Sequence, residues 1–176
     1  MTHRIATIIS HIFNPFFVLI PIFIILTYQS PHGMLAFICM ALVPLVFYFG
    51  AWKTKYISDL FITDRRERPK MLWPLVVLEA SGILIFQLWN ALPILAAIIG
   101  FAIITHFWKI SGHAMAAALV TGTIVATYGW SYWPVLLIVP VVAWARVVRR
   151  DHTLAQVVAG ALYSWTVLFV LNNYFV

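Results

Sequence analysis

Charged side chains are scarce in this sequence. Only 9% of its 176 residues are Asp, Glu, Lys or Arg, whereas 64% are hydrophobic. A soluble domain of this size cannot bury so much apolar side chain in one core. The composition therefore excludes an ordinary soluble protein and indicates a chain whose solvent is lipid.

Cysteine and acidic residues are rare as well. The single cysteine, Cys39, lies inside an apolar run, so we expect it to be a packing residue that says nothing about redox compartment. Five acidic residues stand against 11 Lys and Arg, and the net charge of +6 is of a kind that often indicates nucleic acid or anionic lipid. Because the cations are grouped between apolar runs, we expect membrane lipids as partners and no nucleic acid.

No internal repeat or low-complexity linker divides the chain, so residues 1–176 are expected to form one integral-membrane domain. Seven apolar segments of the length that a hydrocarbon core demands can be drawn, over residues 8–28, 34–52, 71–89, 92–108, 113–128, 133–148 and 154–171. Glu79 and Gln87 interrupt the third segment and the sixth is short, so we expect six to seven membrane-spanning helices. Because lipid offers no partner to backbone polar groups, the predicted fold is an all-α, polytopic membrane bundle.

All cations fall on one side of this seven-segment arrangement. They are Arg4, Lys53, Lys55, Arg65, Arg66, Arg68, Lys70, Lys109, Arg146, Arg149 and Arg150. Short cytoplasmic loops retain Lys and Arg, so this side is expected to face the cytoplasm, with the N-terminus inside and residues 172–174 outside. The prediction is a multi-pass protein of the plasma (inner) membrane of a prokaryote.

The polar stretch at residues 109–113 separates two apolar runs. A Ser111-Gly112 pair that opens a helix offers backbone N–H groups to an anion, and the helix dipole adds partial positive charge. Lys109 adds a full charge, and His113 can give or take a proton near neutral pH. The alternative is an interfacial turn whose Lys109 and His113 only anchor a helix end.

A second polar stretch covers residues 146–152. If the chain is helical here, His152 and Gln156 lie on one face at i and i+4. Arg146 can bind phosphate oxygens through its planar fork, and a histidine can act as nucleophile or acid. A third cluster, residues 53–70, fits a solvated charged loop for most of its length, but it contains Arg68. On one membrane face, these clusters make a phosphate site chemically sensible.

Three blocks in this order resemble the type 2 phosphatidic acid phosphatase superfamily. The signature of that family is an Arg-Pro block, a Ser-Gly-His block, and an Arg followed six residues later by a His. In this chain the matching residues are Arg68-Pro69, Ser111-Gly112-His113, and Arg146 with His152, and Gly160 falls where the family tends to have a glycine. The resemblance covers residues 53–164.

The resemblance implies a role for each matching residue. His152 corresponds to the nucleophile, which forms a phosphohistidine, and His113 to the acid that protonates the leaving alcohol and then assists water. The implied cradle for the phosphoryl oxygens is Arg68, Arg146, Ser111 and the Gly112 N–H. Surrounding cations can stabilise those oxygens, so no metal or cofactor is required. The implied activity is the hydrolysis of a lipid phosphate or diphosphate.

Two departures from the family pattern concern charge. The family has a Lys seven residues before the Arg of the first block, where this chain has Phe61. The candidates for the replacement cation are Arg65, Arg66, Lys70 and Lys109, and we choose Lys109 because it abuts the second block. The family usually has an Asp four residues after the nucleophile, where this chain has Gln156. A Gln carbonyl can accept the Nδ1–H hydrogen bond of His152, but it brings no negative charge.

Other acidic residues could support the nucleophile or serve another function. We expect Asp151 to face elsewhere, whereas Asp64 or Glu67 could reach in from the loop. Glu79, about nine residues into the third segment, is either a substrate or proton contact or a structural residue that is protonated or paired. The alternatives to a phosphatase are a lipid phosphotransferase with the same intermediate, a catalytically silent lipid-binding relative, and a small transporter built on Glu79.

Overall fold

The computed structural model describes residues 1–28 and 30–175, with side chains up to residue 171. Within these residues every regular element is a helix, which confirms the predicted all-α class. The elements in chain order are α1 (Thr2–Ile12), α2 (Pro15–Val18), α3 (Ile20–Thr27), α4 (Gly33–Phe37), η1 (Ile38–Leu42), α5 (Val43–Lys53), α6 (Arg68–Phe86), η2 (Trp89–Ala91), α7 (Leu92–Phe107), α8 (Gly112–Tyr128), η3 (Trp130–Leu137), α9 (Ile138–Val148) and α10 (Leu154–Phe175). Of these, η1 is a π-helix, and η2 and η3 are 3-10 helices.

Five helical segments of the described chain are long and apolar enough to cross a membrane. They are Gly33–Lys53, Arg68–Phe86, Trp89–Phe107, Trp130–Val148 and Leu154–Leu171. Such lengths fit a hydrocarbon core of about 30 Å. The chain therefore has the helices of a multi-pass integral membrane protein. The fifth predicted segment forms α8, which has 17 residues and falls just short of this length.

The first predicted segment is not one helix. The apolar run predicts an uninterrupted helix over residues 8–28, but the chain breaks after Ile12, and the segments Thr2–Ile12 and Pro15–Thr27 are bent by 48° relative to each other. Pro15 has no N–H with which to continue α1, and the Asn14 side chain accepts a hydrogen bond from the Phe16 N–H at 3.1 Å. The two halves make a sixth candidate span if they cross the membrane together.

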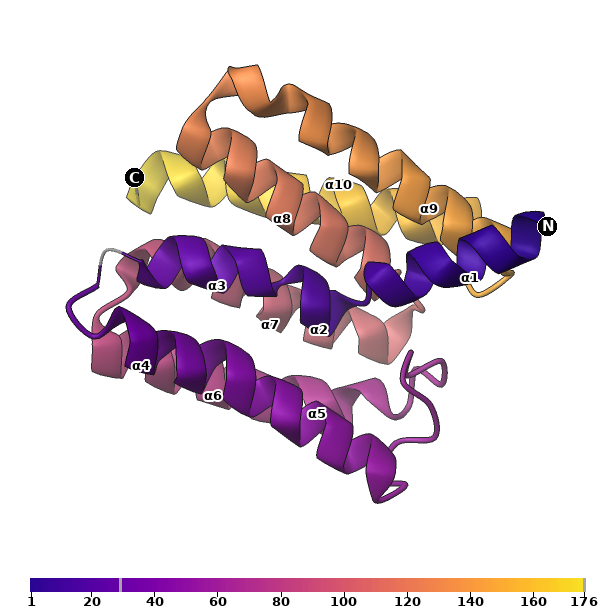
Figure 1. Cartoon of the computed structure of the whole chain (residues 1–176), viewed down its shortest axis with the longest axis horizontal. Coiled ribbons are helices and arrows are strands. Elements are labelled where there is room, and N and C mark those ends of the chain that lie inside the picture. The colour runs from indigo at the N-terminus through magenta and orange to yellow at the C-terminus, as the bar shows by residue number, and fades with distance from the viewer. Residues whose placement is uncertain (29, 176) are drawn as a thin grey trace. The chain divides into compact units, whose positions relative to one another are not determined.

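The chain divides into two compact units. The terminal unit consists of residues 1–22 and 109–174, and the central unit is formed by residues 23–108. In the terminal unit α8, α9 and α10 pack together, and η3 joins α8 to α9 (Figure 1). Their common core consists of Ala117, Ala118, Val139, Val142 and Ala161. In the central unit α6 packs along α7, and η1 packs against α6.

Small residues set the closest approaches inside each unit. A Cβ on Gly160 of α10 would lie 2.6 Å from the carbonyl oxygen of Ser111, so the two segments can meet only because residue 160 has no side chain. A Cβ on Gly82 of α6 would lie 2.6 Å from Cγ of Met40 in η1. The first contact fixes the start of α8 on α10, and the second holds α6 against the π-helical turn.

Candidate active site

The turn between α9 and α10 brings Arg146 and His152 together. Helix α9 ends in a Schellman turn, in which the Asp151 N–H donates to the Arg146 carbonyl at 3.1 Å and the Arg150 N–H donates to the Val147 carbonyl at 2.9 Å. Arg150 takes the left-handed conformation that this turn requires, with φ of 60°. The His152 N–H also lies 3.4 Å from the Arg146 carbonyl. Arg146 and His152, which are six residues apart in the sequence, are therefore in direct contact through their backbones.

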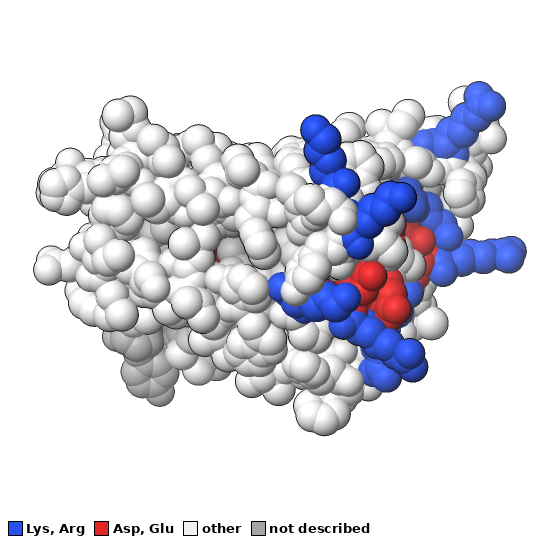
Figure 2. All heavy atoms as spheres, turned by 90° about the horizontal axis from the view of Figure 1, so that it is seen from below, with Lys and Arg blue, Asp and Glu red and all other residues white. Residues whose placement is uncertain are grey.

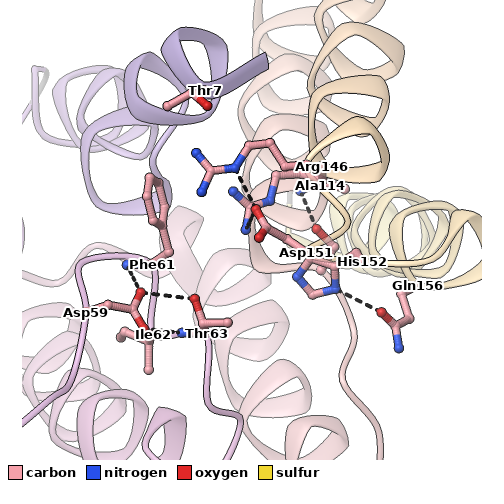
Figure 3. A network of polar contacts seen from close by, with 12 residues as sticks. Thr7, Asp59, Phe61, Ile62, Thr63, Ala114, Arg146, Asp151, His152 and Gln156 are labelled. Atoms are coloured by element: carbon pink, nitrogen blue, oxygen red, sulfur yellow. Dashed lines mark hydrogen bonds and ion pairs between the residues drawn. The ribbon is translucent and has the colours of Figure 1, made fainter. Parts of the chain in front are cut away.

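Asp151 binds the cations of this turn. Its Oδ2 lies 3.0 Å from Nη2 of Arg146 and 2.8 Å from Nε of Arg149. Asp151 and Arg146 lie close together in Figure 3. Arg146 is only 2% exposed, so its charge needs compensation from within the protein. The Asp151 carboxylate binds the two arginines rather than His152, which agrees with the expectation that Asp151 faces elsewhere. Its ion pair with Arg146, the predicted phosphate-binding arginine, is not predicted by the sequence.

The imidazole of His152 is held at Nδ1 by two carbonyl oxygens. Nδ1 lies 3.1 Å from Oε1 of Gln156 and 3.2 Å from the backbone oxygen of Lys109, and the ring points toward the Gln156 amide in Figure 3. Both neighbours can only accept, so Nδ1 carries the proton in the neutral ring and Nε2 carries the lone pair. The expected contact between His152 and Gln156 is confirmed.

A second hydrogen bond fixes the orientation of the Gln156 amide. Its Oε1 also accepts from the Thr153 N–H at 3.1 Å, and the Gln156 N–H donates back to Oγ1 of Thr153 at 3.3 Å. A backbone N–H requires an acceptor, so the oxygen of the amide must face both Thr153 and His152. His152 itself lies in the turn just before α10, whereas Gln156 lies in the first turn of that helix.

The Ser-Gly-His block lies against the same turn. The Ser111 N–H donates to the Gln156 backbone oxygen at 3.2 Å, and the Lys109 carbonyl binds His152. Ser111 is the N-cap of α8, where its Oγ accepts from the Ala114 N–H at 3.4 Å. That bond leaves the hydroxyl proton available to a second partner. The second and third blocks of the signature are therefore one structure in the terminal unit.

Gly112 and His113 are the first two residues of α8. The backbone N–H groups of a first helical turn have no partner within the helix and point toward the space before its N-terminus. His113 is buried, as are Ser111 and Arg146. Lys109 contributes its backbone carbonyl to His152. The sequence does not predict this contact, because the predicted role of Lys109 depends on its charge.

Arg68 belongs to the central unit, where it begins α6. It is buried, its Nε donates to the Ile62 carbonyl at 3.2 Å, and its Nη1 lies 3.4 Å from Oγ1 of Thr105 on α7. The terminal unit therefore holds seven of the eight predicted site residues, and the central unit holds Arg68. These contacts give Arg68 a structural role at the start of α6, and its role in phosphate binding stays a prediction.

The loop before α6 is ordered by its own acidic residues. The carboxylate of Asp59 accepts from the N–H groups of Phe61 and Thr63, and that of Glu67 accepts from the N–H and hydroxyl of Ser58. On the visible face in Figure 2, acidic side chains lie directly among the Lys and Arg side chains. The Glu67 carboxylate therefore forms its hydrogen bonds within the loop. This argues against the alternative in which Glu67 supports the imidazole of His152.

An apolar groove of about 480 Å³ runs between α9 and α10 in the terminal unit. Val147 and Leu154, which line it, flank the turn that carries His152. The lining side chains are Val139, Pro140, Ala143, Trp144, Val147, Leu154, Val157, Val158, Ala161, Leu162 and Trp165. The groove therefore begins beside the polar turn and has only hydrophobic walls.

Comparisons with protein-family models, with curated protein sequences and with solved structures find no match for this chain. The described residues contain no cluster of three or more His, Cys, Asp or Glu side chains that could hold a metal ion.

Proposed function

We propose that this protein is a membrane phosphatase that hydrolyses a lipid phosphate or diphosphate through a phosphohistidine on His152. The observation that carries the proposal is the pair of carbonyl acceptors on Nδ1, from Lys109 and Gln156. Because they hold the proton on Nδ1, the Nε2 lone pair is the nucleophile. A histidine with only a packing role does not need its tautomer fixed by two acceptors.

The proposed reaction has two steps. Nε2 of His152 attacks the phosphorus, and the N–P bond forms as the P–O bond to the leaving group breaks. His113 gives the leaving oxygen a proton, so an alcohol or a phosphate departs. Water then attacks the phosphorus, a new P–O bond forms as the N–P bond to His152 breaks, His113 takes up a proton of that water, and inorganic phosphate leaves.

Gln156 and Lys109 support the positive charge that develops on the ring. When Nε2 bonds to phosphorus, the imidazole becomes cationic and its Nδ1–H becomes a stronger donor. Two carbonyl dipoles then stabilise the cation in place of one carboxylate. The absence of an Asp at position 156 is thus compensated in part by the backbone of Lys109, and we expect a slower enzyme rather than an inactive one.

The remaining polar groups of the terminal unit fit the phosphoryl oxygens. Arg146 supplies a buried guanidinium, Gly112 a first-turn N–H, and Ser111 a hydroxyl proton. The groove between α9 and α10 supports a lipid substrate, because an acyl or prenyl chain placed there lies beside the turn that carries His152.

The test is turnover by the purified full-length chain in detergent on a panel of lipid phosphates and diphosphates. Wild type should release phosphate in a vanadate-sensitive way, and His152→Ala should lose at least a hundredfold in rate while keeping its helical content. His32→Ala, in the loop before α4, is the matched control and should keep full activity. Equal rates for wild type and His152→Ala contradict the proposal, and transfer to an added alcohol identifies a phosphotransferase.

A further inference from the structure

Glu79 is a buried carboxyl in the middle of a candidate membrane span. It lies 11 residues after Arg68, where α6 begins, which places it roughly 16 Å along the helix. The half-thickness of a hydrocarbon core is about 15 Å. Glu79 is 2% exposed, and neither of its carboxyl oxygens has a hydrogen-bond partner among the residues that the structure describes.

The segment facing this part of α6 is the π-helical turn η1. Gly82 lies one turn after Glu79 on α6, and the Met40 side chain of η1 fills the space beside it. In η1 the Val43 N–H donates to the Ile38 carbonyl, one residue further back than in an α-helix. The next residue, Pro44, has no N–H and therefore contributes no donor to the carbonyl groups of this turn. Single π turns inside α-helices are rare and are frequent at functional sites.

No charged side chain compensates Glu79 within the described part of the central unit. The described ion pairs lie elsewhere, and the elements packed against α6 offer few titratable groups. These groups are Cys39 in η1, Tyr48, whose hydroxyl donates to the Leu60 carbonyl, Lys53 at the end of α5, and His106, which lies 3.4 Å from Nε1 of Trp73. No hydrogen bond or ion pair joins any of them to Glu79.

These surroundings decide which ligand the carboxyl can take. An ionised carboxylate without donors or a cation is strongly disfavoured at this depth, so the group is held as a neutral acid. A metal ion needs several further ligands, and the described residues offer no cluster of His, Cys, Asp or Glu side chains around Glu79. A proton needs only the carboxyl itself and occasional access for water, for which the π turn is the natural place because the regular helical hydrogen-bond pattern is interrupted there.

We propose that Glu79 is a proton-binding site of the central unit, which releases and takes up its proton reversibly and thereby changes the packing of α6 on η1. The binding of the proton neutralises the carboxyl and permits the packing seen here. Its loss leaves a carboxylate that draws in water and loosens the turn containing Met40. This site is independent of the proposed phosphatase chemistry.

Infrared spectroscopy of the full-length protein in lipid bilayers tests whether the proton exchanges. A protonated carboxyl absorbs in a region free of other protein bands, so its loss can be followed as the pH is raised. Wild type should show a band that shifts in D2O and disappears reversibly at alkaline pH, whereas Glu79→Gln should lack it. The control Glu67→Gln, in the loop before α6, should keep it. A band that persists unchanged in D2O and at alkaline pH, or no band at all, overturns the proposal.

The single cysteine provides a second measurement, because Cys39 lies in η1 itself. Its rate of alkylation is compared between wild type and Glu79→Gln at each pH, so the pH dependence of the thiol cancels in the ratio. The ratio of the wild-type rate to the Glu79→Gln rate should be close to one at acidic pH. It should rise at least threefold at alkaline pH, where only wild type carries a charge at residue 79. A ratio of one at every pH overturns the coupling to η1. Slowing of the wild-type rate by added sodium, with no effect on Glu79→Gln, overturns the proton as the ligand.

Discussion

At the scale of single residues, the site depends on a few polar groups that hold one another in place. His152 has a fixed tautomer because Gln156 and the Lys109 carbonyl accept from the same nitrogen. Gln156 in turn has a fixed amide because Thr153 donates to it. Two substitutions separate the roles of these groups from general packing.

The first substitution series concerns Gln156. Gln156→Leu removes one of two acceptors from His152, so turnover should fall about tenfold, the equivalent of one hydrogen bond of about 1.4 kcal/mol. Gln156→Asp restores a negative charge beside the imidazolium and should equal or exceed the wild-type rate. The measurement is initial-rate kinetics on the best lipid phosphate. Identical rates for all three proteins mean that residue 156 does not support the nucleophile.

The second substitution concerns Asp151, which occupies Arg146 in this structure. A phosphate group has to share that guanidinium with the carboxylate or displace it. Asp151→Asn removes the competing charge, so the affinity for vanadate should rise about threefold to tenfold, or about 1 kcal/mol. Asp64→Asn, which removes the same charge from the central unit, should change it little. Weaker vanadate binding by Asp151→Asn instead identifies Asp151 as the residue that positions Arg146.

At the scale of elements, the α9–α10 turn is the structure on which the site depends. In this Schellman turn the backbone N–H groups of Asp151 and His152 both donate to the carbonyl oxygen of Arg146. Position 150, with φ of 60°, has the left-handed conformation that glycine usually takes at this place in a Schellman turn, and a side chain there costs about 1 kcal/mol.

Arg150→Gly should therefore stabilise the protein by about 1 kcal/mol and raise its apparent unfolding temperature in detergent. Arg150→Ala is the matched control, because it removes the same charge but keeps the Cβ that causes the strain, and it should give no such gain. Circular dichroism during heating provides the measurement. Equal stabilisation by both variants attributes the effect to charge rather than to the backbone.

At the scale of the whole molecule, charge asymmetry predicts how the chain is inserted. In the central unit the Lys and Arg residues lie at the end of α5, in the loop that follows and in the first turn of α6. In the terminal unit, Lys109 precedes α8, and Arg146, Arg149 and Arg150 end α9. Within each unit these cations lie at helix ends joined by hydrogen bonds, such as those of Arg68 to Thr105 and of Ser111 to Gln156.

Cysteine labelling in intact cells tests the predicted orientation, after Cys39 has been replaced by Ala. A cysteine at Thr54, in the exposed loop after α5, should resist a membrane-impermeant thiol reagent because positive loops remain in the cytoplasm. A cysteine at Ser131, exposed at the other end of α8, should react. The reverse pattern overturns the orientation, and labelling at both positions means that α8 does not cross the membrane. The predicted outer position of residues 172–174 concerns side chains outside the described residues.

The all-α membrane class, the approximate limits of most helices and the grouping of the cations could all be predicted from the order of the residues. Each of these depends on local properties, because lipid demands apolar runs of a given length and internal satisfaction of every backbone group. The contact between His152 and Gln156 was also accessible, since a spacing of four residues is local. Hydropathy does not reveal the break at Asn14, because Pro15 lies inside an apolar run.

The partners of the polar groups, by contrast, depend on how the folded segments meet. The Lys109 carbonyl reaches His152 across 43 positions of sequence, and Ser111 meets the Gln156 backbone because Gly160 lets α10 approach the start of α8. The same holds for Glu79, whose burial beside a π turn depends on how α6 packs on η1. Apolar patterns specify which segments enter the membrane, but the partner of a buried polar group depends on which segments then meet.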